Sequence, residues 1–303
     1  MTKQSTPTTV DMSARFLKVK LSITAWGNSK QAKDCAAEME ASKGAEVGKS
    51  LKAGKILLDP TALEAIGKAR NALMTQHKAI TGIWDDSNWR LLPTSRYFEY
   101  SEKMNPLISL FNAAADELES RYITLVDEAR SRLNGLFNDD DYPGEIEFRQ
   151  RFSIKTSIEN LAAGTDTSRI NLPAEEVDKI TASMQEAFSE NLHRVQGDQW
   201  QRLLSVVTNL KDSLIAYDKG DQRTVRQTLI DSIDKTCSDI PDFNVLADPA
   251  LIDAITEIKT QFATVDMSYV RENPALRTET ISAASRAAAK LKAKAVDFAG
   301  YMN

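Results

Sequence analysis

Apolar residues recur every three or four positions along most of the chain, which is the spacing of one face of an α-helix. The pattern predicts helices near residues 28–42, 60–84 and 105–136, and the last of these is a single helix of about 30 residues. Asp59 is expected to cap the second helix, because a carboxylate at that position can accept from free backbone N–H groups. Pro60 suits the first turn of the same helix.

The C-terminal part of the chain reads as five helices separated by short Gly, Asp and Pro breaks. They are expected at residues 173–195, 198–218, 221–238, 248–264 and 275–302. Apolar residues alternate spacings of three and four over 200–217, and again over 281–302, which is the pattern of a coiled-coil seam. The second seam contains Ile281, Ala284, Ala288, Leu291, Ala295 and Phe298.

Alanine at three positions of the second seam allows a partner helix to approach closely. That partner lies either in the same chain, in an antiparallel bundle, or in a second molecule, in which case the seam serves assembly. We favour the bundle as the simpler interpretation, and both alternatives remain open at this point.

Residues 16–26 alternate apolar and polar side chains, which predicts a half-buried β-strand. Two further β-rich runs, 148–158 and 168–172, flank a loop at 163–166 and are expected to join this strand in a small sheet. The fold class is therefore mainly α with a small β-sheet (α+β), with a long helical hairpin and a bundle with coiled-coil-like seams. We divide the chain into a disordered arm (1–13), an N-terminal α+β region (14–172) and a C-terminal helical bundle (173–303).

The composition of the 303 residues, 42% hydrophobic and 27% charged, is that of an ordinary soluble protein. The net charge of -5 gives no general attraction to nucleic acid. We find no secretory signal and no apolar run long enough to cross a membrane. Cys35 and Cys237 lie in separate helical patterns and are expected to be reduced thiols, so we expect a cytoplasmic protein without membrane contact.

No motif identifies a catalytic, cofactor-binding or metal-binding residue, so we expect a protein that is not an enzyme. The segment 44–50 resembles a phosphate-binding loop, but three residues rather than four separate its glycines, and a flexible connection is expected instead. His77 and His193 are far apart, and a buried helical position is the simplest role for His77. The run 139–141 lacks the ligand spacing of an EF-hand and is expected to be a solvated turn.

The densest group of aromatic and arginine side chains spans residues 83–100. Its candidate partner-binding residues are Trp89, Arg90, Arg96 and Tyr97. Such side chains concentrate binding energy in protein interfaces, and they also stack unpaired bases and contact phosphates. The third interpretation is a corner between two helices that tryptophans anchor in the core.

Three short motifs occur in a characteristic order: SITAWGNSKQAKDCAAEME at 22–40, Trp89 to Pro93, and Arg151 to Ser153. Over roughly residues 15–180 this order resembles an uncharacterised family of helical proteins from tailed bacteriophages and bacterial mobile elements. The resemblance implies MoxR-type AAA ATPases and von Willebrand factor A-like proteins as partners, and a host cytoplasm as the setting. It implies no activity and no catalytic residues.

These observations favour a non-enzymatic helical interaction or assembly protein, phage-encoded, that binds itself or a protein partner. It would act as an adaptor, an assembly component or an inhibitor of a host system. The alternative is a single-stranded nucleic-acid-binding protein that uses the aromatic and arginine segment, although the acidic side chains near that segment count against it.

Overall fold

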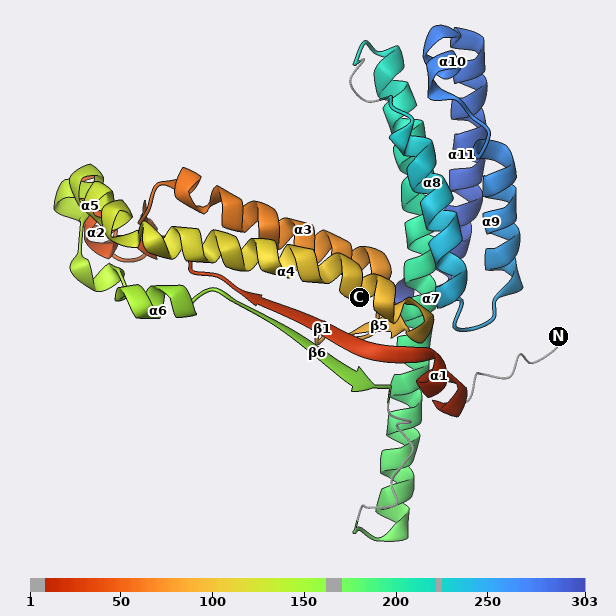
Figure 1. Ribbon diagram of the computed structural model, residues 1–303, viewed down its shortest axis with the longest axis horizontal. Coiled ribbons are helices and arrows are strands. Elements are labelled where there is room, and N and C mark those ends of the chain that lie inside the picture. Colours follow the sequence, from red (N-terminus) through yellow and green to blue (C-terminus); the bar gives the residue numbers. More distant parts are fainter. Residues whose placement is uncertain (1–8, 162–170, 222–224, 303) are drawn as a thin grey trace. The chain divides into compact units, whose positions relative to one another are not determined.

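The computed structural model describes residues 9–161, 171–221 and 225–302 (Figure 1). It is mainly α-helical with a small antiparallel sheet, which confirms the predicted fold class. The chain divides into two compact units that are interleaved in sequence. Unit 1 is built from 1–19, 80–97 and 158–303, whereas unit 2 is built from 20–79 and 98–157.

The bounds of the regular elements follow the chain. The helices of unit 1 are α1 Thr9–Arg15, α7 Ala174–Asp218, α8 Thr228–Asp239, α9 Pro249–Phe262, α10 Met267–Glu272 and α11 Pro274–Val296. The helices of unit 2, apart from Ile80 and Tyr97 at its borders, are α2 Lys33–Ser42, α3 Glu64–Ile80, α4 Tyr97–Ser120, α5 Tyr122–Leu133 and α6 Glu145–Gln150. The strands are β1 Phe16–Thr24, β2 Ser29–Gln31, β3 Gly54–Ile56, β4 Gly82–Ile83, β5 Arg90–Pro93 and β6 Ser153–Asn160.

The division expected between residues 172 and 173 differs from these units. Unit 1 takes up the start of β1 and the segment 80–97 because their apolar side chains pack with those of α7 and the residues after α8. The expected disordered arm also differs, since α1 begins at Thr9 and Met12 is fully buried beside Phe16. Residues 1–8 of that arm lie outside the described residues.

The larger sheet has the strand order β4-β5-β1-β6. β1 pairs antiparallel with β5, so that Phe16 lies opposite Pro93 and Val19 opposite Arg90. Val19 and Leu21 are buried whereas Ser22 and Thr24 are exposed, as the alternation predicted. The second sheet contains β2 and β3.

β6 joins the first strand in the sheet as expected, but it begins at Ser153 rather than at residue 148. Phe148 lies in α6 instead, where its ring stacks on that of Tyr122 with 3.8 Å between centroids. The loop at 163–166 and most of the strand expected at 168–172 fall outside the described residues. Residues 171 and 172 do not form a strand.

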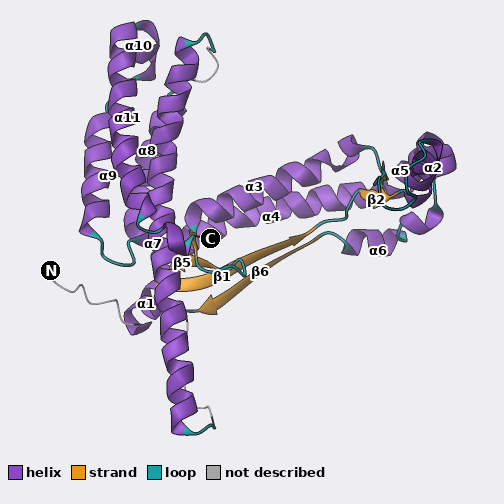
Figure 2. Ribbon diagram, turned by 180° about the vertical axis from the view of Figure 1, so that it is seen from behind, coloured by secondary structure: helices purple, strands orange, loops and turns teal. Residues whose placement is uncertain are grey.

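The C-terminal half of α7 forms a four-helix bundle with α8, α9 and α11 (Figures 1 and 2). α7 packs on α8 and α11, while α9 packs on α8 and α11. The core of the bundle contains Trp200, Leu203, Val207, Leu210 and Leu214 of α7, Ile230, Ile233 and Cys237 of α8, Leu251, Ile255, Ile258 and Phe262 of α9, and Ala284, Ala287, Ala288 and Leu291 of α11. Both predicted seams therefore face this core.

The helices expected at 173–195 and 198–218 are one continuous helix of 45 residues, α7. Gly197, which we took as a break, is instead a site of close packing. A Cβ at this position would lie 2.8 Å from the Cβ of Phe298 and 3.1 Å from the Sδ of Met302. Glycine is therefore required by the approach of the C-terminal residues rather than by a turn.

The first predicted helix was placed too early, because residues 29–31 form β2. Asn28 does not cap a helix: its Nδ2 donates to the Leu58 carbonyl over 2.8 Å, and its Oδ1 accepts from the Leu58 N–H over 2.7 Å. Asp59 does cap the next helical segment, since its carboxylate accepts from Thr61 N–H at 2.9 Å.

α3 and α4 run side by side in unit 2 (Figures 1 and 2). α3 ends at Ile80 rather than at Trp84, and the long helix predicted from residue 105 starts at Tyr97 and breaks at Arg121 into α4 and α5. Pro106 lies inside α4 on its exposed side, where the lost backbone hydrogen bond faces water.

Candidate functional site

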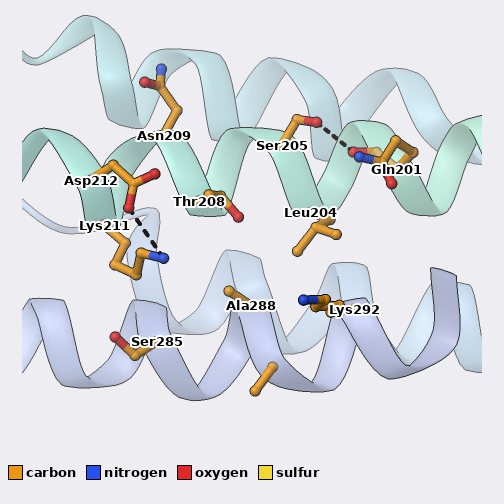
Figure 3. A pocket seen from close by; sticks show the side chains of 11 residues that line it. Gln201, Leu204, Ser205, Thr208, Asn209, Lys211, Asp212, Ser285, Ala288 and Lys292 are labelled. Carbon is orange, nitrogen blue, oxygen red and sulfur yellow. Dashed lines mark hydrogen bonds and ion pairs between the residues drawn. The ribbon is translucent and has the colours of Figure 1, made fainter. Parts of the chain in front are cut away.

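A groove of about 720 Å³ runs between α7 and α11 and is open to solvent. Small side chains line much of it, and Figure 3 shows Leu204 and Thr208 turned toward α11 while Ala288 is turned toward α7. The lining residues with small or apolar side chains are Leu204, Ser205, Thr208, Ser285, Ala288 and Ala289.

The helical repeat explains why this groove exists. Residues of α7 that follow the core stripe by one position point away from the bundle axis, and on α11 residues 285, 289 and 292 do the same. Buried Ala284, Ala287 and Ala288 let α11 pack closely on α7. Because the flanking positions also carry small side chains, nothing fills the space above this contact.

The rim of the groove is charged and its floor is hydroxyl-rich. Lys211 pairs with Asp212 at 3.1 Å, and Lys292 lines the α11 side. The hydroxyl of Ser205 donates to the Gln201 carbonyl over 2.8 Å, and that of Ser285 donates to the Ile281 carbonyl over 2.7 Å. Such a lining suits a peptide or helix that brings both apolar contacts and a few polar groups.

The residues predicted to form an assembly seam lie against the chain's own α7. Ala284, Ala288 and Leu291 are buried, while Ile281, Ala295 and Phe298 are partly buried against the same core. The antiparallel-bundle interpretation of this seam therefore fits the structure. Only Ala288 among the six also reaches the groove.

The four candidate partner-binding residues are engaged within unit 1. Trp89 packs against the core cluster that contains Phe16 and Trp84, and the Lys18 ammonium lies 4.8 Å from its ring centroid. Arg96 is buried and pairs with Asp239 at 3.1 Å.

Arg90 is held by Thr81, the residue just before β4. Its Nε donates to the Thr81 hydroxyl over 2.6 Å and a terminal nitrogen donates to the Thr81 carbonyl over 2.7 Å. Arg202 of α7 donates to the same carbonyl over 2.5 Å and pairs with Asp198 at 2.9 Å. Burial lowers the pKa of Arg90 to about 10, with Asp198 opposing and Arg202 reinforcing the change.

These contacts match the third interpretation of the aromatic and arginine segment, a corner anchored in the core by Trp84 and Trp89. Tyr97, the first residue of α4, is half-buried. The ring and guanidinium groups on which a nucleic-acid interpretation depends are thus covered by protein. The acidic partners of Arg96 and Arg202 would also repel phosphates.

His77 is buried, as expected, and its Nδ1 lies 3.0 Å from the hydroxyl of Tyr100. Burial raises the pKa of that phenol above its ordinary value. His193 stacks on Tyr301 with 4.7 Å between ring centroids. Across residues 9–161, 171–221 and 225–302, no group of three or more His, Cys, Asp or Glu side chains is placed to hold a metal ion.

Sequence reasoning missed two buried carboxylates in unit 2. Asp141, expected in a solvated turn, is buried and binds both Lys30, at 2.6 Å, and Lys55. Burial alone would raise the pKa of Asp141, but the two ammonium groups lower it below its ordinary value. Glu40 is the second: its carboxylate accepts three backbone N–H groups from residues 48–51, so the connection expected to be flexible is held in place.

Comparison with known proteins adds no name to this fold. No family model matches the chain, and neither a curated protein nor a solved structure matches it. The resemblance to the bacteriophage and mobile-element family therefore stays a prediction. Among the described residues, no helix combines the length and the apolar character that crossing a bilayer requires.

Proposed function

We propose that this chain is a non-enzymatic helical interaction protein that binds a helix or an extended segment of a protein partner in the groove between α7 and α11. The observation that carries the proposal is the groove itself, an open volume of about 720 Å³ between two helices of a well-packed bundle. Its small side chains let the backbone of a bound segment come close, and its rim charges orient that segment.

The binding surface differs from both sets of residues that the sequence favoured. The seam at 281–298 and the arginines of the aromatic segment hold the bundle and the sheet together, which leaves the groove as their solvent-facing product. The role is that of an adaptor, an assembly component or an inhibitor. The resemblance to a bacteriophage family supports a bacterial cytoplasm as the setting and an AAA ATPase of the MoxR type as one partner to test first.

The test is an affinity capture with chemical cross-linking from native or infected cells, read out by mass spectrometry. The bait is used as wild type, as Ala289→Arg, which fills the groove, and as Ala293→Arg. Ala293 is exposed on α11 outside the groove, so the second variant carries the same chemical change without the obstruction. We expect a partner that is recovered with the wild type and the Ala293 variant and lost with the Ala289 variant. Recovery of the same proteins with all three baits contradicts the proposal.

A further inference from the structure

β6 is the last strand of the larger sheet in the part of the chain that the structure describes. It is eight residues long and runs beside β1 (Figure 1). Its side chains are open to solvent toward the C-terminal end, where Ile158 is 41% exposed and the Glu159 side chain 54% exposed. An edge strand of this length offers a row of backbone N–H and C=O groups to another strand.

Proteins usually protect such an edge with proline, a bulge or repelling charge. The sequence of β6, SIKTSIEN, contains no proline or glycine. Its two charged residues, Lys155 and Glu159, have opposite signs and cancel. The strand is therefore not protected by like charge against a second copy of itself.

We propose that two copies of this chain pair through β6, antiparallel and around a twofold axis at Ser157. In this register Lys155 lies opposite Glu159 of the second copy, and the reciprocal pair forms on the other side of the axis. Thr156 lies opposite Ile158 of the second copy on the other face. Opposite charges placed directly across two antiparallel strands stabilise their pairing.

The neighbouring symmetric registers lack this complementarity. An axis at Thr156 places Lys155 opposite Ser157 of the second copy, and an axis at Ile158 places Ser157 opposite Glu159. Both leave the ammonium and the carboxylate without opposite charges from the second copy. Charge thus selects Ser157 as the centre.

Glu159 already has one cationic neighbour and has room for another. Its Oε2 lies 3.0 Å from the ammonium of Lys18 on β1, which in turn lies over the ring of Trp89. Pairing adds Lys155 of the second copy on the outer side of the same carboxylate. The result is a row of alternating charges that runs from β1 through β6 into the second molecule.

Light scattering over a concentration series tests the pairing through a charge exchange. The wild type should approach twice the chain mass of 33.6 kDa. Lys155→Glu alone brings two carboxylates together at each end, and Glu159→Lys alone brings two ammonium groups together. Each should raise the dissociation constant about tenfold or more. An equimolar mixture of the two variants restores both opposite-charge pairs and should recover the dimer mass.

Lys52→Glu is the matched control, because it makes the same charge change at an exposed position away from β6. It should leave the mass unchanged, and so should Ala289→Arg, since the groove takes no part in this contact. A wild type that stays at 33.6 kDa at every concentration overturns the proposal. A dimer that neither charge variant weakens, or a mixture that recovers nothing, overturns it as well.

A cross-linking measurement covers the case in which a charge variant fails to fold. Ser157→Cys places its thiol next to the same thiol of the second copy, within reach of a disulfide. Ser153→Cys is the control, because four residues separate it from the axis and the two thiols lie far apart. Mild oxidation should give a reducible dimer for the first variant only. Equal yields for the two variants, or none for either, contradict pairing around Ser157.

Discussion

The carboxylate of Glu40 accepts a hydrogen bond from the backbone N–H of Gly48, with 2.5 Å between Oε2 and the nitrogen. Oε1 accepts from the N–H groups of Ser50, at 2.7 Å, and Leu51, at 2.6 Å. Gly48 has a φ of 82°, a conformation in which glycine is favoured. A phosphate-binding loop turns such amides toward a phosphate. Here they surround a carboxylate of the same chain.

The first prediction concerns this loop at neutral pH. Glu40→Gln keeps the shape of the side chain but replaces charge-assisted hydrogen bonds by weaker ones and brings an NH₂ group toward backbone donors. We expect limited trypsin digestion to cut faster after Lys43, Lys49 and Lys52. Glu46→Gln is the control, since Glu46 pairs only with exposed Lys49 on the surface. Equal cleavage in the wild type and both variants would contradict a role for Glu40.

The same contact sets a pH dependence. The hydrogen bond from Gly48, together with those from Leu51 and Ser50, outweighs desolvation and lowers the pKa of Glu40 from its ordinary 4.5. A carboxyl whose pKa is lower in the folded state stabilises that state above its ordinary pKa. The contribution disappears as the pH falls through the lowered value. Loop opening should therefore appear only below about pH 4.5 in the wild type.

The second prediction concerns the two thiols. Cys237 is buried in the core of the bundle, and this burial raises its pKa to about 11, whereas Cys35 is only half-buried. At pH 8 the Cys237 thiol is therefore neutral and covered. Iodoacetamide labelling followed by mass spectrometry should modify Cys35 first and leave Cys237 unmodified until denaturant is added. Equal rates of modification in the native protein would show that the bundle opens at α8.

The third prediction tests the packing of α11 on α7. Leu291 is 3% exposed in the core of the bundle, so Leu291→Ala removes buried methyl groups and leaves a cavity. The free energy of unfolding should fall by about 2–5 kcal/mol in a urea titration. Val296→Ala, at an exposed position of the same helix, should change it by less than about 0.5 kcal/mol. If Leu291 packed between molecules instead, its substitution would lower the mass in light scattering at unchanged unfolding free energy.

The fourth prediction concerns the carbonyl of Thr81, which accepts from both Arg90 and Arg202. Because the two guanidinium groups share one acceptor and one nearby carboxylate, Asp198, their substitutions should not be additive. A double-mutant cycle with Arg90→Met and Arg202→Met should give a coupling free energy of about 0.5–3 kcal/mol. Arg90→Met combined with Lys290→Met, which removes a distant surface pair, should be additive within about 0.5 kcal/mol.

The elements that the sequence predicted well are those whose side chains obey one period. The alternation in β1 and the two seams of the bundle depend only on which faces are buried, and the structure buries those faces. Asp59 was identified as a cap because a helix start is a local signal. The core-corner alternative for Trp84 and Trp89 also rested on local apolar character.

The features that were missed depend on contacts between distant residues. Asn28 has the composition of a helix cap, but its amide is bound by Leu58 thirty residues later. Gly197 looks like a helix break, and only the return of Phe298 to α7 shows why it is glycine. Glu40 and Asp141 look like surface acids until the loop amides and the lysines that bind them are in place. The groove, likewise, is formed by two helices whose pairing the spacing alone did not specify.

The interleaving of the two units has a consequence for synthesis on the ribosome. Unit 2 is complete once residue 157 has been made, whereas the strands β4 and β5 of unit 1 emerge long before α7 and the residue Phe243 that help to bury them. A nascent chain therefore carries Trp84 and Leu91 without their eventual cover until translation is nearly finished. Stalling or early termination after residue 172 would leave that apolar surface open to chaperones and proteases.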